Sequence, residues 1–203
     1  MPDQNIQQHI QQQFTDSADL KYHAAPLLCQ PIEQAVQALL TCLTAGGKVL
    51  ACGNGGSAAD AQHFAAEFVG RFERERPELA ALSLSTDTSV ITALANDYGF
   101  DLVFSRQVRA LGQIGDVLLA ISTSGNSANV LAAIDAAHER DMVVIGLSGR
   151  GGGKMAQALY GGDVHICVPH DRTARIQEVH LLVLHCLCDT LDRQLLGYQE
   201  SLS

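Results

Sequence analysis

Short apolar runs alternate with longer segments of helical periodicity over most of this chain. Strand-like runs are found at residues 48–52, 79–84, 117–122, 143–147 and 164–168. Helical patterns occupy residues 58–68, 89–96, 103–111, 129–140 and about 173–196. Strands that are apolar on both faces and separated by helices indicate a parallel sheet covered on both sides. We therefore predict an α/β fold, a three-layer α-β-α sandwich around a central five-stranded parallel sheet.

The N-terminal part of the chain has the pattern of helices. Ile6, Ile10 and Phe14 recur every four residues in a Gln-rich stretch, which places them on one stripe of a helix. A Gln-rich run is also typical of disorder, but the regular stripe favours a helix that packs on something, such as a neighbouring subunit.

Two prolines, Pro26 and Pro31, punctuate the next stretch. A second helix is expected after them, from about residue 32 to residue 43, ending at the following glycine pair. We divide the chain into an N-terminal helical segment, residues 1–45, which packs in the oligomer, and a domain at residues 46–203.

Composition and charge narrow the class of protein. The chain has 203 residues, 47% of them hydrophobic, enough for one compact domain. Its formal net charge of -9 argues against broad binding of nucleic acid, which needs a basic face. No long apolar run or signal-peptide pattern is present, so we expect a cytoplasmic protein that does not enter a membrane. The six cysteines match no zinc-finger spacing and are expected to be reduced thiols.

The loop after the first strand is rich in glycine. Gly53-Asn54-Gly55-Gly56-Ser57 lies directly between a strand and a helix, where glycines permit close approach of the backbone to a ligand. Ser57 is expected to cap the helix. The loop lacks the Lys of a P-loop and does not match GxGxxG, so nucleotide binding is not favoured. An ordinary capped turn is the alternative interpretation.

The loop after the third strand is rich in hydroxyl groups. Residues 122–127 are Ser122, Thr123, Ser124, Gly125, Asn126 and Ser127. Hydroxyl and amide donors beside a helix N-terminus can bind a phosphate dianion without any Lys or Arg. Ordinary turns do not need so many hydroxyls, so we expect a phosphate site here. A third Gly-rich stretch, residues 148–154, is interpreted mainly as a flexible crossover.

Two helices carry polar groups among apolar ones. His63 and Glu67 are four residues apart and lie on one helix face, as a surface pair, as two metal ligands, or as a base beside a ligand. Gln177 and His185 interrupt the last, apolar helix. A lone His on such a helix is more often a satisfied core residue, so these residues alone do not settle the chemistry.

Several motifs together resemble one family. They are the Cys52–Ser57 loop, Asn96-Asp97, the segment from Ile121 to Ser127, and Arg175-Ile176-Gln177-Glu178-Val179-His180. In order and spacing they resemble the sugar isomerase (SIS) domain family, and within it the isomerases that act on a heptose phosphate. The resemblance implies conversion of sedoheptulose 7-phosphate to D-glycero-D-manno-heptose 7-phosphate through a cis-enediol, toward the heptose of lipopolysaccharide. It also implies a homotetramer.

The resemblance assigns roles to particular residues. It implies one Zn²⁺ per subunit, bound by His63, Glu67, Gln177 and His185, with Glu67 and His185 as the catalytic acid/base pair. It implies that the substrate is bound by Asn54, Gly55, Gly56, Asn96, Asp97, Ser122, Thr123, Ser124, Ser127 and Gln177. Gln177 and His185 are eight residues apart, about 12 Å along a helix, so both reach one metal only if their side chains lean together or come from different subunits.

One alternative is a protein of another class. A relative in the same family binds the replication initiator protein and is not an isomerase. That regulator has lost the acid/base pair at the positions that match Glu67 and His185, whereas this chain has both residues. We therefore expect an enzyme.

Overall fold

The sheet is the centre of the molecule. The computed structural model describes residues 5–197. Five parallel strands form one sheet in the order β2-β1-β3-β4-β5. They are β1 (Val49–Gly53), β2 (Ala81–Ser83), β3 (Val117–Ser122), β4 (Val143–Gly149) and β5 (Val164–Val168). The predicted α/β class and the five-stranded parallel sheet are confirmed.

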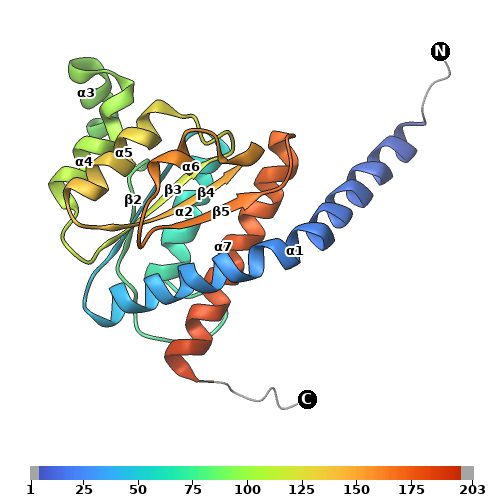
Figure 1. Ribbon diagram of the computed structural model, residues 1–203, viewed down its shortest axis with the longest axis horizontal. Helices are drawn as coiled ribbons and strands as arrows, with labels where there is room; N and C mark the ends of the chain where they lie inside the picture. Colours follow the sequence, from blue (N-terminus) through green and yellow to red (C-terminus); the bar gives the residue numbers. More distant parts are fainter. Residues whose placement is uncertain (1–4, 198–203) are drawn as a thin grey trace.

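Helices cover both faces of this sheet (Figure 1). One layer holds α1 (Ile6–Thr44), α2 (Gly56–Val69) and α7 (Thr173–Leu196). The other holds α4 (Val103–Leu111), α5 (Ala128–Glu139) and α6 (Met155–Ala158). The helix α3 (Thr88–Tyr98) and the short 3-10 helix η1 (Phe100–Leu102) lie beside α4 and have no buried residue. A second 3-10 turn, η2 (Arg150–Gly152), follows β4.

Alternate strand residues supply the two cores. Val49 and Ala51 of β1 point to the α1/α2/α7 layer, whereas Leu50 and Cys52 point to the α4/α5 layer. All five residues of β1 are buried, as are all six of β3. This two-sided burial is the reason that the strands read as continuous apolar runs.

The N-terminal helix differs from the prediction. We expected two helices separated by prolines, but α1 is one continuous helix that contains both Pro26 and Pro31. A proline removes one backbone hydrogen bond and normally breaks a helix. Here one stripe continues through both positions and is buried against the core: Leu20, Ala24, Leu28, Ala35, Val36, Leu39 and Cys42. Packing of this stripe outweighs the local cost of the prolines.

The strand order reverses between β1 and β3. The chain leaves β1 toward β2 at one edge, then returns to β3 on the other side of β1. In open parallel sheets ligands bind beyond the carboxyl ends of the strands at such a switch point. No helix among residues 5–197 is long and apolar enough to cross a membrane.

Candidate active site

The two predicted ligand loops meet at the switch point. Because β1 and β3 are paired side by side, the loops that follow them are neighbours. The amides of Asn54 and Asn129 join the two loops through reciprocal hydrogen bonds of 2.8 and 2.9 Å. Asn129 is 2% exposed and belongs to α5, just beyond the predicted loop. Sequence reasoning missed it because its position does not reveal a partner in another loop.

The helices that begin at these loops have no side-chain caps. Gly55 is the N-cap of α2, with a φ of 56°. Ser127 is the N-cap of α5, but its hydroxyl lies 2.9 Å from that of Ser122 instead of binding the helix. By contrast, Asn5 caps α1 and Asp87 caps α3. Two uncapped N-termini side by side form a suitable anion site. The expected cap by Ser57 is wrong, since Ser57 lies inside α2 beyond Gly55 and Gly56.

The third Gly-rich stretch supports the hydroxyl-rich loop. Thr123 and Ser124, both half-buried, form the turn between β3 and α5. The side-chain oxygen of Asn126 accepts a hydrogen bond from the Lys154 backbone (3.0 Å), and the Gly125 carbonyl accepts one from Met155 (2.9 Å). The crossover at residues 148–154 therefore forms a wall of the hydroxyl-rich loop rather than a free connection.

Helices α2 and α7 bring His63 into contact with His185, and Glu67 lies beside His63. The Nε2 atoms of His63 and His185 are 3.0 Å apart, and the two rings meet edge to face. Glu67 lies one turn along α2, with its carboxylate 3.6 Å from Nδ1 of His63. All three side chains are partly exposed, as a site open to a ligand requires.

Gln177 lies at the other end of this helix pair. A Cβ atom at Gly56 would overlap the Gln177 amide, so that side chain reaches the first loop. His185 instead contacts His63, seven residues along α2 from Gly56, a separation of about 10 Å. Within one chain, α2 and α7 thus run in the same direction and hold two polar groups two turns apart, with Gln177 beside the Gly-rich loop.

The donor set near His185 suits a zinc ion. Zinc binds imidazole nitrogens at about 2.0–2.1 Å, which puts two of them about 3.3 Å apart in a tetrahedral site. The observed 3.0 Å between His63 and His185 is close to this spacing. Among residues 5–197, however, no three His, Cys, Asp or Glu side chains are already grouped as a metal site. The Glu67 carboxylate lies at Nδ1 of His63, away from the Nε2 atom that faces His185, and would have to turn toward the pair to bind the same ion.

An acidic residue next to this cluster was missed. Asp60 precedes His63 by three residues and so shares its helix face. Burial raises the pKa of Asp60 to about 6, although nearby His63 acts in the opposite direction. Its Oδ2 atom is buried without a hydrogen-bond partner among residues 5–197. The i, i+3, i+7 spacing of Asp60, His63 and Glu67 was visible in the sequence, but its burial was not.

Asn96 and Asp97 lie apart from the other predicted residues. Both are exposed near the C-terminal end of α3, and the Asn96 amide donates to the Asp97 carboxylate (2.8 Å). The hydrogen bonds of residues 5–197 do not connect this pair to either ligand loop. Their role in binding substrate stays a prediction.

Comparison with known proteins identifies the family. The SIS domain profile matches residues 13–149. The curated phosphoheptose isomerase of Methylibium petroleiphilum is 70% identical over 96% of this chain and 98% of its own length. The chain belongs to the phosphoheptose isomerases of the SIS domain family. It is therefore an isomerase, as the motifs predicted.

Solved structures of relatives share the fold. The phosphoheptose isomerase from Neisseria gonorrhoeae is 58% identical, with a TM-score of 0.89 over 93% of this chain and 99% of that chain. The enzyme from Francisella tularensis is 44% identical, with a TM-score of 0.90 over the same shares. The SIS architecture expected from the motifs is confirmed.

Proposed function

We propose that this isomerase converts sedoheptulose 7-phosphate to D-glycero-D-manno-heptose 7-phosphate. The reaction takes place in the cytoplasm and leads toward the heptose of lipopolysaccharide. The observation that carries the proposal is the distance between two groups of residues. The phosphate loops lie at the start of α2, and the His63/His185 pair lies two turns, about 10 Å, farther along. This separation suits an open-chain sugar whose phosphate and carbonyl are at opposite ends.

The phosphate group of the substrate is bound by polar groups that carry no full positive charge. The N-termini of α2 and α5 direct their dipoles at the loops, and the hydroxyls of Ser122, Thr123, Ser124 and Ser127 donate to phosphate oxygens. Asn54, Gly55 and Gly56 supply the other side of the cradle. Binding of this remote group orients the reacting carbons, so that it contributes to kcat as well as to KM.

The reacting end needs a base and a proton donor. Glu67 removes the proton beside the carbonyl, giving a cis-enediol, exchanges that proton with solvent, and delivers a proton to the adjacent carbon. His185 moves the proton between the two oxygens, and His63 holds the His185 ring in place. Bound zinc would polarise the carbonyl, and His63, Glu67 and His185 are residues of one chain that would hold it. Gln177, the remaining ligand, would come from a neighbouring subunit, because within one chain it lies beside Gly56, two turns from His185. Gln177 also faces the sugar from beside Gly56.

The direct test is an NMR assay of product from sedoheptulose 7-phosphate in D₂O. We expect aldose product that carries solvent deuterium at the carbon next to the carbonyl. Glu67→Gln and His185→Gln should lower kcat about a hundred- to ten-thousand-fold, because each removes a proton-transfer group. Glu75→Gln is the matched control, since that carboxylate is 87% exposed and pairs with Arg71 on the surface.

Near-normal kcat in both site variants would reject the proposed acid/base roles. Absence of turnover by the unsubstituted chain, together with binding to the replication initiator protein, would instead favour the regulator. Metal content measured by mass spectrometry tests the zinc proposal separately. We expect about one zinc per chain, and less in His63→Gln.

A further inference from the structure

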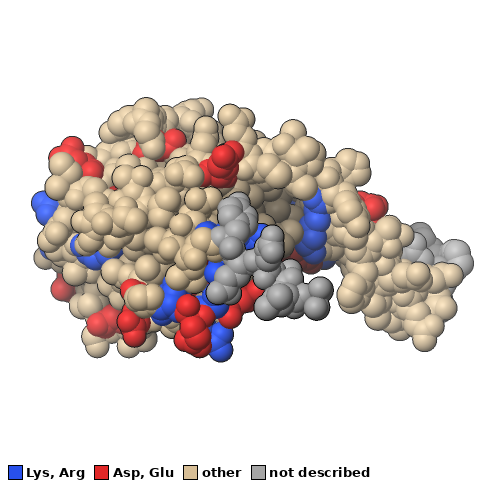
Figure 2. All heavy atoms as spheres, turned by 90° about the horizontal axis from the view of Figure 1, so that it is seen from below, with Lys and Arg blue, Asp and Glu red and all other residues tan. Residues whose placement is uncertain are grey.

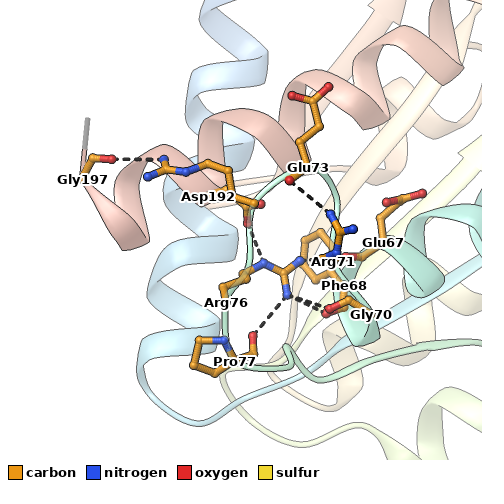
Figure 3. Close-up of polar contacts among 10 residues, drawn as sticks. Glu67, Phe68, Gly70, Arg71, Glu73, Arg76, Pro77, Asp192 and Gly197 are labelled. Atoms are coloured by element: carbon orange, nitrogen blue, oxygen red, sulfur yellow. Dashed lines mark hydrogen bonds and ion pairs between the residues drawn. The ribbon is translucent and has the colours of Figure 1, made fainter. Parts of the chain in front are cut away.

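One arginine, Arg76, connects three segments that surround the proposed acid/base pair. Arg76 lies in the loop between α2 and β2, and its Nε atom is 2.6 Å from Oδ1 of Asp192 on α7. Figure 3 shows the guanidinium directed between the end of α2 and α7. Both side chains are only 2% exposed, so the ion pair is buried although its loop lies on the surface.

The same guanidinium binds the end of α2. Its nitrogens donate to the carbonyls of Glu67 (2.7 Å) and Phe68 (2.9 Å), and to that of Pro77 in its own loop (3.2 Å). The last carbonyls of a helix lack partners within the helix, and a cation at this end also interacts favourably with the helix dipole. Arg76 thus fixes the backbone at Glu67 itself.

Arg76 is also connected to His185, through Asp192 on the same helix and through Phe72 in the Arg76 loop. Asp192 follows His185 by seven residues, two turns along the same side of α7. Phe72, in the Arg76 loop, packs against the His185 ring with ring centroids 5.4 Å apart. The clamp formed by Arg76 and Asp192 therefore connects the backbone of Glu67, the helix of His185 and the aromatic ring that covers His185.

A gain in folding stability does not by itself explain why Arg76 and Asp192 form a buried ion pair. Burying two charges costs much of what their attraction returns, and apolar side chains of similar volume often serve equally well. A rigid guanidinium fork, however, fixes the direction of several hydrogen bonds at once. We propose that Arg76 and Asp192 are positioning residues that hold Glu67 and His185 in register for proton transfer. The inference rests on the proposed function of those two residues.

Conservative variants separate positioning from folding. In Arg76→Lys the charge is kept but the fork is lost, and in Asp192→Asn the acceptor oxygen is kept but the charge is lost. We expect both to fold and kcat for sedoheptulose 7-phosphate to fall at least about tenfold, because small displacements of reacting groups are costly. KM should change less than about twofold, since the clamp does not contact the phosphate loops.

Matched controls lie beside each position. Arg71→Gln removes an exposed arginine from the same loop, and Asp189→Asn removes a partly exposed ion-pair partner from the same helix. Both should keep the kcat of the unsubstituted chain. A kcat within twofold of that value in folded Arg76→Lys and Asp192→Asn would overturn the proposal. If neither folds, the double variant Arg76→Met/Asp192→Leu replaces the pair with apolar volume, and the same fall in kcat is expected.

A spectroscopic measurement does not depend on turnover. The ring ¹⁵N signals of His63 and His185 report the contact between their Nε2 atoms. We expect these signals to move in Asp192→Asn and to stay unchanged in Asp189→Asn. Unchanged signals in both would overturn the clamp. Inactivity of the unsubstituted chain, with signals that still move in Asp192→Asn, would overturn the proposed function alone.

Discussion

His180 shows how burial controls a single titratable group. It lies on α7, 0% exposed, and its Nε2 atom donates to the Ser148 carbonyl at the end of β4 (3.0 Å). Its Nδ1 atom is buried and has no partner in the described part of the chain, so protonation would add a donor that no described group accepts. Burial lowers the pKa of His180 to about 4 and also lowers the pKa of His165, which contacts the Ser148 hydroxyl.

The depressed pKa of His180 predicts acid sensitivity. The unfolded chain binds a proton at this side chain below about pH 6.5, whereas the folded chain stays neutral down to about 4. Stability is therefore lost as pH falls through this window, by up to about 1.4 kcal/mol per pH unit from this one group. Urea unfolding between pH 7 and 5 should show the decline. His180→Gln should flatten it, and an unchanged slope in a folded variant would contradict the assignment.

At the scale of elements, the β3–α5 turn depends on a close backbone approach. Gly125 has a φ of 63°, and a Cβ atom there would overlap the carbonyl oxygen of Gly152. Gly151 has a similar φ of 70° but open space where a Cβ would lie. The two glycines therefore separate backbone strain from steric contact between the loops.

Gly125→Ala should damage the phosphate site more than Gly151→Ala. Both substitutions strain the backbone by about 1–2 kcal/mol, but only the first pushes the hydroxyl-rich loop away from its wall. We expect KM for the sugar phosphate to rise at least about tenfold in Gly125→Ala, since a displaced donor set loses charge-assisted hydrogen bonds. Equal KM values in the two variants would show that the contact with Gly152 is unimportant.

Local patterns predicted the elements better than the contacts between them. The bounds of β3, α4 and α7 agree with the apolar periodicity, and both ligand loops lie where glycines and hydroxyls gather. The continuity of α1 through Pro26 and Pro31 was missed because it depends on packing, which local rules do not include. The reciprocal amides of Asn54 and Asn129 were missed for the same reason, as they join residues far apart in sequence.

At the scale of the whole molecule, the N-terminal half of α1 projects away from the body (Figure 1). Ile6, Ile10 and Phe14 are 76%, 51% and 75% exposed along one stripe. Figure 2 shows that this arm is almost free of charged side chains, in contrast to the body. An arm with few charges and an exposed apolar stripe is typical of a surface that another chain covers. This feature supports the proposed homotetramer, in which α1 packs on a neighbouring subunit.

A charge placed on the stripe tests that assembly. In Phe14→Glu, a carboxylate would have to be buried wherever the arm packs, so we expect smaller species in sedimentation velocity. Gln8→Glu adds the same charge on the opposite side of the helix and should keep the assembly. If subunits share the site, for example through the exposed Asn96–Asp97 pair, kcat should fall together with the tetramer. A fully active monomer would show that one chain holds every group the reaction needs, and that the arm serves the assembly without serving the chemistry.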